Sequence, residues 1–280
     1  MAAALQVVRA RRRVAIVDAG ERRNRFASHA HGFLGQDGRP PGEIAAEARR
    51  QLTAYPTLTW MDGRVRRAAR EGEGFAIETE DGATHAARRL VLACGVTDTL
   101  PAVAGLAERW GTGVFHCPYC HSYELGEGRL GVLAVGPLSI HHAQLIPEWG
   151  PTTFFLNGAF DPDADQRDDL AARGVEIEPT PVAGIVGGSD VRLVDGRVVP
   201  LVGLFTASST APASPLAADL GCALEEGPLG PFVRTNAMQE TSVCGVFACG
   251  DVARAAGSVS FAVGDGAMAG AAVHRSLVFG

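Results

Sequence analysis

A strand, a turn, a helix and a second strand follow one another between residues 130 and 156. Residues 130–135 carry no charged or polar side chain, which is typical of a strand buried on both faces of a sheet. The strand ends at Gly136, and we expect a helix over residues 139–148 and a second strand over 152–156. A helical crossover of this kind joins parallel strands. The sequence therefore predicts an α/β fold with a parallel sheet.

The start of the chain contains part of a second such unit. Residues 2–12 place apolar side chains at helical spacing, a short apolar strand follows at 14–17, and Asp18 stands at its carboxyl end. Helix, strand and acidic residue form the second half of a Rossmann unit. Its GxGxxG turn lies about 20 residues before the acid, whereas Met1 stands only 17 positions before Asp18. We therefore expect the first strand and its glycine turn to be absent.

Composition excludes several function classes. The 280 residues carry a formal net charge of -6, which gives no electrostatic basis for binding nucleic acid or an anionic membrane. All 25 basic residues are arginines, so a P-loop lysine and a Schiff-base lysine are excluded. The chain has no run of the roughly 18 apolar residues of a membrane span and no signal-peptide pattern. We expect a cytoplasmic protein with reduced structural thiols.

Cys117 and Cys120 form a Cys-Pro-Tyr-Cys motif followed by His121. Zinc would need a second pair, and the remaining four cysteines show no C-x₂-C spacing, so no metal site is expected. The motif also matches the C-x-x-C-H pattern of haem attachment, which requires export, and a purely structural pair of cysteines is a further possibility. A helix start and the flanking His116 and His121 favour a lowered thiol pKa, because helix N–H groups and an imidazolium stabilise a thiolate. We interpret the motif as a redox-active dithiol.

A further landmark is the apolar strand at 246–248 with Gly250-Asp251 after it. Such a glycine lets the backbone approach a ligand, and the aspartate can hold the ribityl hydroxyls of a flavin. The motif is common on its own, but its place in the order of landmarks is informative. In chain order these are Asp18, Leu-Ala-Cys-Gly at 92–95, the dithiol, the α/β unit from 130 and Phe-Ala-Cys-Gly-Asp at 247–251.

This order resembles the low-molecular-weight thioredoxin reductases, of the pyridine nucleotide-disulfide oxidoreductase family, across nearly the whole chain. The strings at 117–124 and 24–35 look closer to the branch of FAD-dependent dithiol oxidases that close disulfides in small natural products. The resemblance implies a Rossmann-like flavoprotein fold with two dinucleotide-binding domains. A discontinuous FAD domain (1–112 and 203–280) would carry a smaller inserted α/β domain (113–202) with the dithiol. It also implies a homodimer.

The resemblance implies roles for single residues as well. Cys120 would be the thiol nearest the flavin and Cys117 the interchange thiol that meets substrate. His121 stands where thioredoxin reductases have an acid that protonates the leaving thiolate. The residues expected to contact FAD are Asp18 at the adenosine ribose, Asp251 at the ribityl chain, Ser260 and Phe261 at the isoalloxazine ring, and Arg25, His31, Gly95 and Gly250.

The inserted domain departs from the family at its own nucleotide turn. Residues 135–139 read Val-Gly-Pro-Leu-Ser, so one glycine stands where two or three are needed, and Pro137 and Leu138 add bulk where a pyrophosphate would approach. The family's arginine pair for the NADPH 2′-phosphate is also missing, since no arginine follows the strand at 152–156 until Arg167. We expect NADPH binding to be lost. His141 and His142 after this turn are possible substrate-side bases, although solvated helix histidines are the commoner case.

Three functions follow from these observations. The first is an oxidase that passes electrons from a small-molecule or peptide dithiol through Cys117 and Cys120 to FAD and then to oxygen. The second is an NADPH-dependent thioredoxin-disulfide reductase with thioredoxin as its partner. The third is a truncated, non-catalytic remnant, since losing the first strand and glycine turn would weaken FAD binding. The intact dithiol favours an enzyme.

Overall fold

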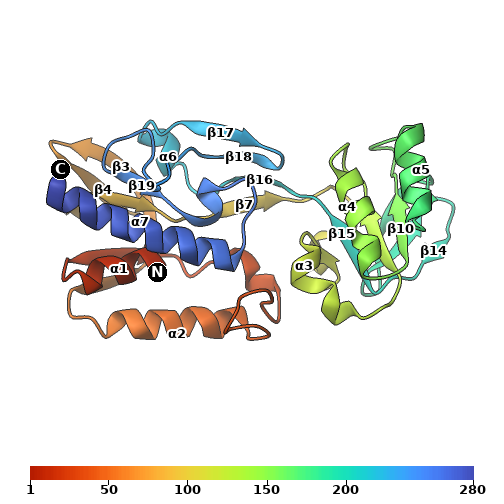
Figure 1. Cartoon of the computed structure of the whole chain (residues 1–280), viewed down its shortest axis with the longest axis horizontal. Coiled ribbons are helices and arrows are strands. Elements are labelled where there is room, and N and C mark those ends of the chain that lie inside the picture. The colour runs from red at the N-terminus through yellow and green to blue at the C-terminus, as the bar shows by residue number, and fades with distance from the viewer.

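The computed structural model describes residues 1–280, and its sheets gather into two lobes at opposite ends of an elongated molecule (Figure 1). The lobe built from β8 to β15 is called the dithiol lobe here, because it contains Cys117 and Cys120. The lobe built from the elements before β7 and after β16 contains both ends of the chain and is called the terminal lobe. No helix has both the length and the apolar character that a membrane span requires.

The terminal lobe contains two parallel strand pairs. β1 (Val14–Asp18) pairs with β2 (Leu58–Asp62), and β6 (Leu90–Leu92) pairs with β19 (Val246–Ala248). Antiparallel strands complete the lobe: β3 (Val65–Glu71), β4 (Gly74–Thr79) and β5 (Thr84–Ala87) form one sheet, and β17 (Leu224–Gly227) and β18 (Gly230–Val233) form a hairpin. Its helices are α1 (Ala2–Arg9), α2 (Pro41–Thr53), α6 (Leu216–Asp219) and α7 (Val259–Phe279).

Close packing of α1 against α7 positions the carboxyl-terminal helix. A Cβ added to Gly266 would lie 2.9 Å from the Cβ of Ala2, and one added to Gly270 would collide with the backbone of Ala3. Glycine at these two positions lets the helices approach as closely as an interior of native density requires. The amino-terminal end of α7 is thereby held near the junction of the two lobes (Figure 1).

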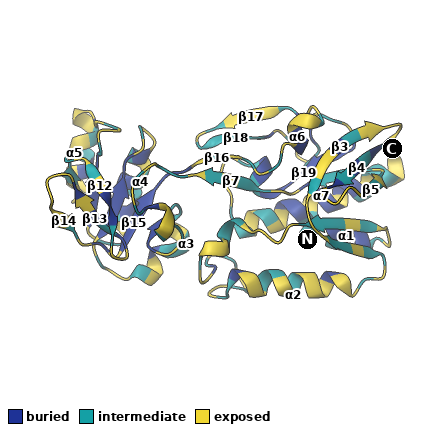
Figure 2. Ribbon diagram, turned by 180° about the vertical axis from the view of Figure 1, so that it is seen from behind, coloured by how far each residue is buried: buried dark blue, intermediate teal, exposed yellow.

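The dithiol lobe is built on a parallel five-stranded sheet of order β11-β10-β9-β15-β8. Its strands are β8 (Val114–Phe115), β9 (Leu130–Leu133), β10 (Thr152–Phe155), β11 (Glu176–Glu178) and β15 (Gly203–Thr206). Every residue of β9, β10 and β15 is buried, because the sheet is covered on both faces; β15 is dark blue in Figure 2. The predicted strand, helix and strand over 130–156 are confirmed.

Two different layers cover this sheet. On one face lie α4 (Ser139–Leu145) and α5 (Ala164–Ala172), and on the other lie the antiparallel strands β12 (Val182–Val186), β13 (Asp190–Leu193) and β14 (Val198–Val199). The expected end of the inserted domain at residue 202 needs a correction. β15 pairs with β8 and β9 inside this sheet, so the sheet continues past that boundary.

The chain crosses between the lobes twice, and the two crossings pair with each other. β7 (Val96–Thr99) and β16 (Ser209–Pro212) are antiparallel neighbours, with Asp98 opposite Thr210. The hydroxyl of Ser208 also donates to Oδ1 of Asp98 at 2.6 Å. The lobes are therefore joined by a two-stranded ribbon (Figure 1).

Candidate active site

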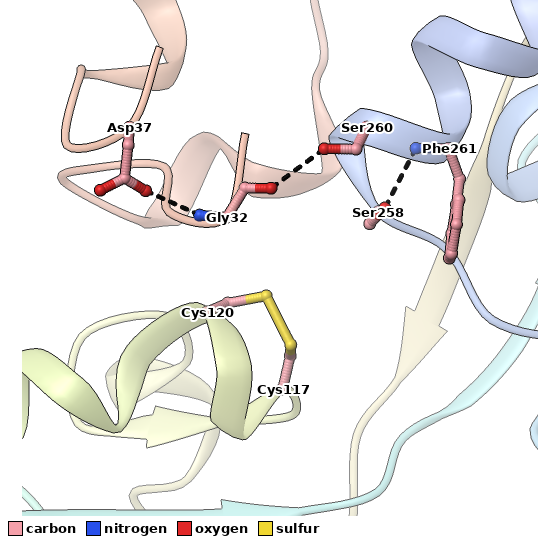
Figure 3. Close-up of a disulfide and its surroundings, with 7 residues drawn as sticks. All are labelled: Gly32, Asp37, Cys117, Cys120, Ser258, Ser260 and Phe261. Carbon is pink, nitrogen blue, oxygen red and sulfur yellow. Dashed lines mark hydrogen bonds between the residues drawn. A yellow bond between two sulfur atoms is a disulfide. The ribbon is translucent and has the colours of Figure 1, made fainter. Parts of the chain in front are cut away.

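Cys117 and Cys120 form a disulfide at the start of α3 (Pro118–His121), with their Cα atoms 5.4 Å apart (Figure 3). Cys117 is the N-cap residue after the short strand β8, and Pro118 occupies the first helical position, where its fixed φ suits a helix start. One helical turn then returns Cys120 to the sulfur of Cys117. The two cysteines are therefore placed so that a disulfide between them can open and close.

Both histidines that flank the motif are largely buried, and this changes their expected charge. Burial, and next the charge of His31, lower the pKa of His121 to about 4, and its ring stacks on Phe115 with centroids 4.4 Å apart. Burial also lowers the pKa of His116, with a further contribution from Arg23. Both imidazoles are neutral near pH 7. They suit proton acceptance, whereas the expected stabilisation of a thiolate by an imidazolium is not supported.

Three buried side-chain polar atoms in the chain lack a hydrogen-bond partner: Nδ1 of His116, Oγ of Ser122 and Nδ1 of His142. Leaving such a group unpaired costs roughly 1–3 kcal/mol. His116 adjoins Cys117, Ser122 follows His121, and His142 packs edge-on against His116. Unpaired groups in a native structure commonly mark functional sites. Two of these three belong to residues within two positions of a dithiol cysteine, and the third packs against one of them.

The terminal lobe presents a polar segment opposite the disulfide (Figure 3). Ser258 caps α7 by accepting from the Phe261 N–H at 3.1 Å, and Ser260 Oγ donates to the Gly32 carbonyl at 3.0 Å. The Gly32 N–H in turn donates to Asp37 at 2.8 Å. These bonds fix the loop around Gly32 to the start of α7. In Figure 3 Cys120 lies on the side of the disulfide nearer this segment.

His31 connects this loop to the dithiol lobe. Its Nδ1 lies 3.3 Å from Oε1 of Glu124, two residues after Ser122 on the dithiol lobe, and 3.7 Å from Oδ1 of Asp37. His31 was expected at the cofactor, and its contact with Glu124 had no sequence signal, because 93 residues separate the two.

The other residues expected at FAD lie at the carboxyl ends of the parallel strands. Asp18 ends β1 and accepts from the Gly20 N–H at 3.0 Å, Gly95 follows β6, and Gly250 and Asp251 follow β19. Gly95 has φ +69° and nothing within 4 Å of an added Cβ, so its backbone faces open space. Ligands of open α/β sheets bind at this edge. The open glycine backbone and the two carboxylates fit a dinucleotide such as FAD.

Asp251 forms an ion pair with Arg23, which lies in the 3-10 helix η1 (Arg23–Phe26). Arg23 NH1 lies 3.0 Å from Asp251 Oδ2, and Arg23 NH2 lies 2.7 Å from Asp98 Oδ1. Burial opposes ionisation of Asp98, yet the hydrogen bonds from Arg23 and Ser208 hold its pKa below the ordinary value. Sequence reasoning missed Arg23 and Asp98. Arg25, which was expected at FAD, donates to the nearby Arg22 carbonyl and lies over the Phe26 ring.

The nucleotide turn of the dithiol lobe lies between β9 and α4. Val135 N donates to Ser139 Oγ at 2.9 Å, and Gly136 is its only glycine. At the end of β10, Asn157 Oδ1 accepts from the Val182 N–H at 2.9 Å. Both polar groups are therefore engaged within the protein.

Comparisons with known proteins agree with this geometry. The family model described as "Pyridine nucleotide-disulphide oxidoreductase" matches residues 1–266. The chain is 33% identical to "Thioredoxin reductase tcpT" of Claviceps purpurea, over 99% of this chain and 91% of that protein. The crystal structure of an oxidoreductase from Agrobacterium tumefaciens is 58% identical, with a TM-score of 0.97 over 99% of this chain and 94% of that one. That of HlmI is 35% identical, with a TM-score of 0.91 over 99% and 88%.

Fold, dithiol and comparisons lead to one conclusion. The expected Rossmann-type flavoprotein fold and the expected cofactor class are confirmed at the level of the family, whose members bind FAD. The chain belongs to the pyridine nucleotide-disulphide oxidoreductase family, as a thioredoxin-reductase-like, FAD-dependent thiol/disulfide oxidoreductase.

Proposed function

We propose that this protein oxidises a small-molecule or peptide dithiol and passes the electrons through FAD to oxygen. The main support for this proposal is the nucleotide turn of the dithiol lobe, which offers few free backbone N–H groups. Pro137 has no N–H, the Val135 N–H is bonded to Ser139, and Leu138 projects into solvent with 52% of its surface exposed. A pyrophosphate needs several backbone N–H groups at a helix start. A reductase fed by NADPH would lack its electron entry here.

The first chemical step is a thiol–disulfide exchange at Cys117. A substrate thiol gives its proton to the neutral His116 imidazole, and its sulfur bonds to Cys117 Sγ. The Cys117–Cys120 bond breaks, and Cys120 Sγ keeps the electron pair. The second substrate thiol then attacks the mixed disulfide, which releases Cys117 and closes the substrate disulfide. His121 follows Cys120 in the chain, and we propose that it exchanges a proton with the Cys120 thiol.

FAD, when bound, supplies the two-electron acceptor that restores the Cys117–Cys120 disulfide. The residues proposed to hold it come from the terminal lobe: Asp18, Arg25, His31, Gly95, Gly250, Asp251, Ser260 and Phe261. We propose the terminal lobe as the FAD domain and the dithiol lobe as the inserted domain. A cytoplasmic homodimer is part of the same proposal.

A second candidate is a thioredoxin reductase. The name of the relative tcpT favours it, and its disulfide substrate would be thioredoxin. It needs NADPH to reduce the flavin, so the two functions differ in the direction of electron flow through Cys117 and Cys120.

Oxygen uptake separates these functions. FAD-loaded protein mixed with excess dithiothreitol in air is expected to form one hydrogen peroxide per disulfide closed. Cys117→Ser is expected to abolish that activity, while Cys244→Ser, which changes an exposed free cysteine, is expected to retain it. Thioredoxin reduction supported by NADPH, without oxygen uptake from dithiothreitol, would favour the reductase instead.

A further inference from the structure

The imidazole of His116, the residue before Cys117, packs against the imidazole of His142, and each ring has an unpartnered nitrogen. His116 directly follows β8, and His142 lies on α4. Their ring centroids are 5.6 Å apart and their planes are nearly perpendicular, at 71°. Nδ1 of each ring is buried and has no hydrogen-bond partner. The two unpartnered nitrogens therefore belong to rings that are in edge-to-face contact.

A third imidazole continues the series to the surface. The ring of His141 lies 6.3 Å from that of His142, centroid to centroid, and the His141 side chain is exposed. The series therefore runs from the neighbour of Cys117 through a mostly buried ring to solvent. The expectation of solvated helix histidines holds for His141 and is wrong for His142, which α4 turns toward the sheet and His116.

Burial and nearby positive charge favour the neutral forms of His116 and His142, so each ring can accept a proton. Burial is the main cause that lowers the pKa of His142 to about 4, and positive charge on His116 or His141 lowers it further. His116 faces Arg23, which disfavours its protonation, and Asp98 and the Thr206 carbonyl, which favour it. A proton on one ring thus discourages a second on its neighbour. A proton bound to one of these rings is therefore readily released to a neighbouring acceptor.

We propose that His142 takes the proton that His116 receives from a substrate thiol and passes it through His141 to water. This rests on the proposed dithiol oxidation. The proton leaves the attacking thiol as its sulfur bonds to Cys117, Cys120 keeps the electron pair of the broken disulfide, and His116 returns to its neutral form. His142 touches neither substrate nor sulfur and is a positioning residue that acts through His116.

The exchange step is measurable without any flavin chemistry. The oxidised full-length protein is mixed with dithiothreitol and quenched with iodoacetamide at set times. Intact mass spectrometry then counts the newly alkylated cysteines. His142→Gln is expected to slow the exchange by about tenfold near pH 6, where thiols need a base. Above about pH 9 the reagent is largely thiolate, so the variant and wild type are expected to agree. His85→Gln, in the distant strand β5, is the matched control and should follow wild type throughout.

The pH dependence of the His142→Gln rate distinguishes a proton relay from a structural role. A purely structural role for His142 predicts equal slowing at every pH, and either that or unchanged rates near pH 6 would overturn the relay. Added free imidazole is expected to restore the pH 6 rate of His142→Ala, which keeps the test decisive if the glutamine variant folds poorly. If dithiothreitol fails to reduce wild-type Cys117–Cys120, the proposed function itself is overturned, together with the relay.

Discussion

Arg23 and Asp251 are 228 positions apart in the sequence, yet Arg23 NH1 lies 3.0 Å from Asp251 Oδ2. The same guanidinium also binds Asp98, which lies in β7, one strand of the ribbon that joins the lobes. One arginine thus ties the carboxyl end of β19 to the interlobe crossing. The candidate cofactor edge and the ribbon between the lobes therefore share a single ionic cluster.

Arg23→Gln is expected to destabilise the protein by about 1–3 kcal/mol, because it leaves two partly buried carboxylates without their cation. Urea unfolding followed by circular dichroism measures the change. Arg25→Gln serves as the control, since Arg25 makes only local contacts, and it should fall within about 0.5 kcal/mol of wild type. Equal effects of the two substitutions would show that the cluster contributes little.

His121 is expected to stay neutral until the pH falls to about 4, below the ordinary value of 6.5, because burial disfavours its charged form. The unfolded chain binds this proton first, so His121 makes stability fall as pH drops from about 6.5 toward 4. NMR titration of the ring proton, assigned by its loss in His121→Gln, checks the pKa. A midpoint at the ordinary value would contradict the buried, stacked ring.

Gly270→Ala and Gly264→Ala form a matched pair on α7. The added methyl group at 270 would collide with the Ala3 backbone, whereas an added Cβ at 264 has nothing within 4 Å. Gly270→Ala is expected to cost about 1–3 kcal/mol by overpacking. Gly264→Ala is expected to gain up to about 1 kcal/mol from helix propensity. Thermal unfolding of both variants measures the difference, and a stabilised Gly270→Ala would refute the close α1–α7 contact.

Cys120→Ser, with Cys117 reduced, is expected to form a mixed disulfide when a disulfide compound is added. The adduct accumulates because the Cys120 thiol that would release Cys117 is absent. Intact mass spectrometry under non-reducing conditions detects the adduct. Cys117→Ser should give much less adduct if Cys117 is the thiol that meets substrate. More adduct on Cys117→Ser would reverse the two assignments.

The sequence predicted features whose signal is local. The buried strands over 130–156 and the dithiol at a helix start each follow from neighbouring residues, and the structure confirms them. Contacts between distant segments carried no such signal. Arg23 with Asp98, His31 with Glu124 and His116 with His142 arise only when the two lobes and their sheets assemble.

The reagent that reduces the flavin distinguishes a dithiol oxidase from an NADPH-dependent reductase. FAD-loaded protein is mixed anaerobically in a stopped-flow instrument with dithiothreitol in one experiment and with NADPH in another. Dithiothreitol is expected to bleach the visible flavin absorbance rapidly, Cys117→Ser is expected to prevent this, and NADPH is expected to have no effect. Rapid bleaching by NADPH, with none by the dithiol, would contradict the proposed dithiol oxidation.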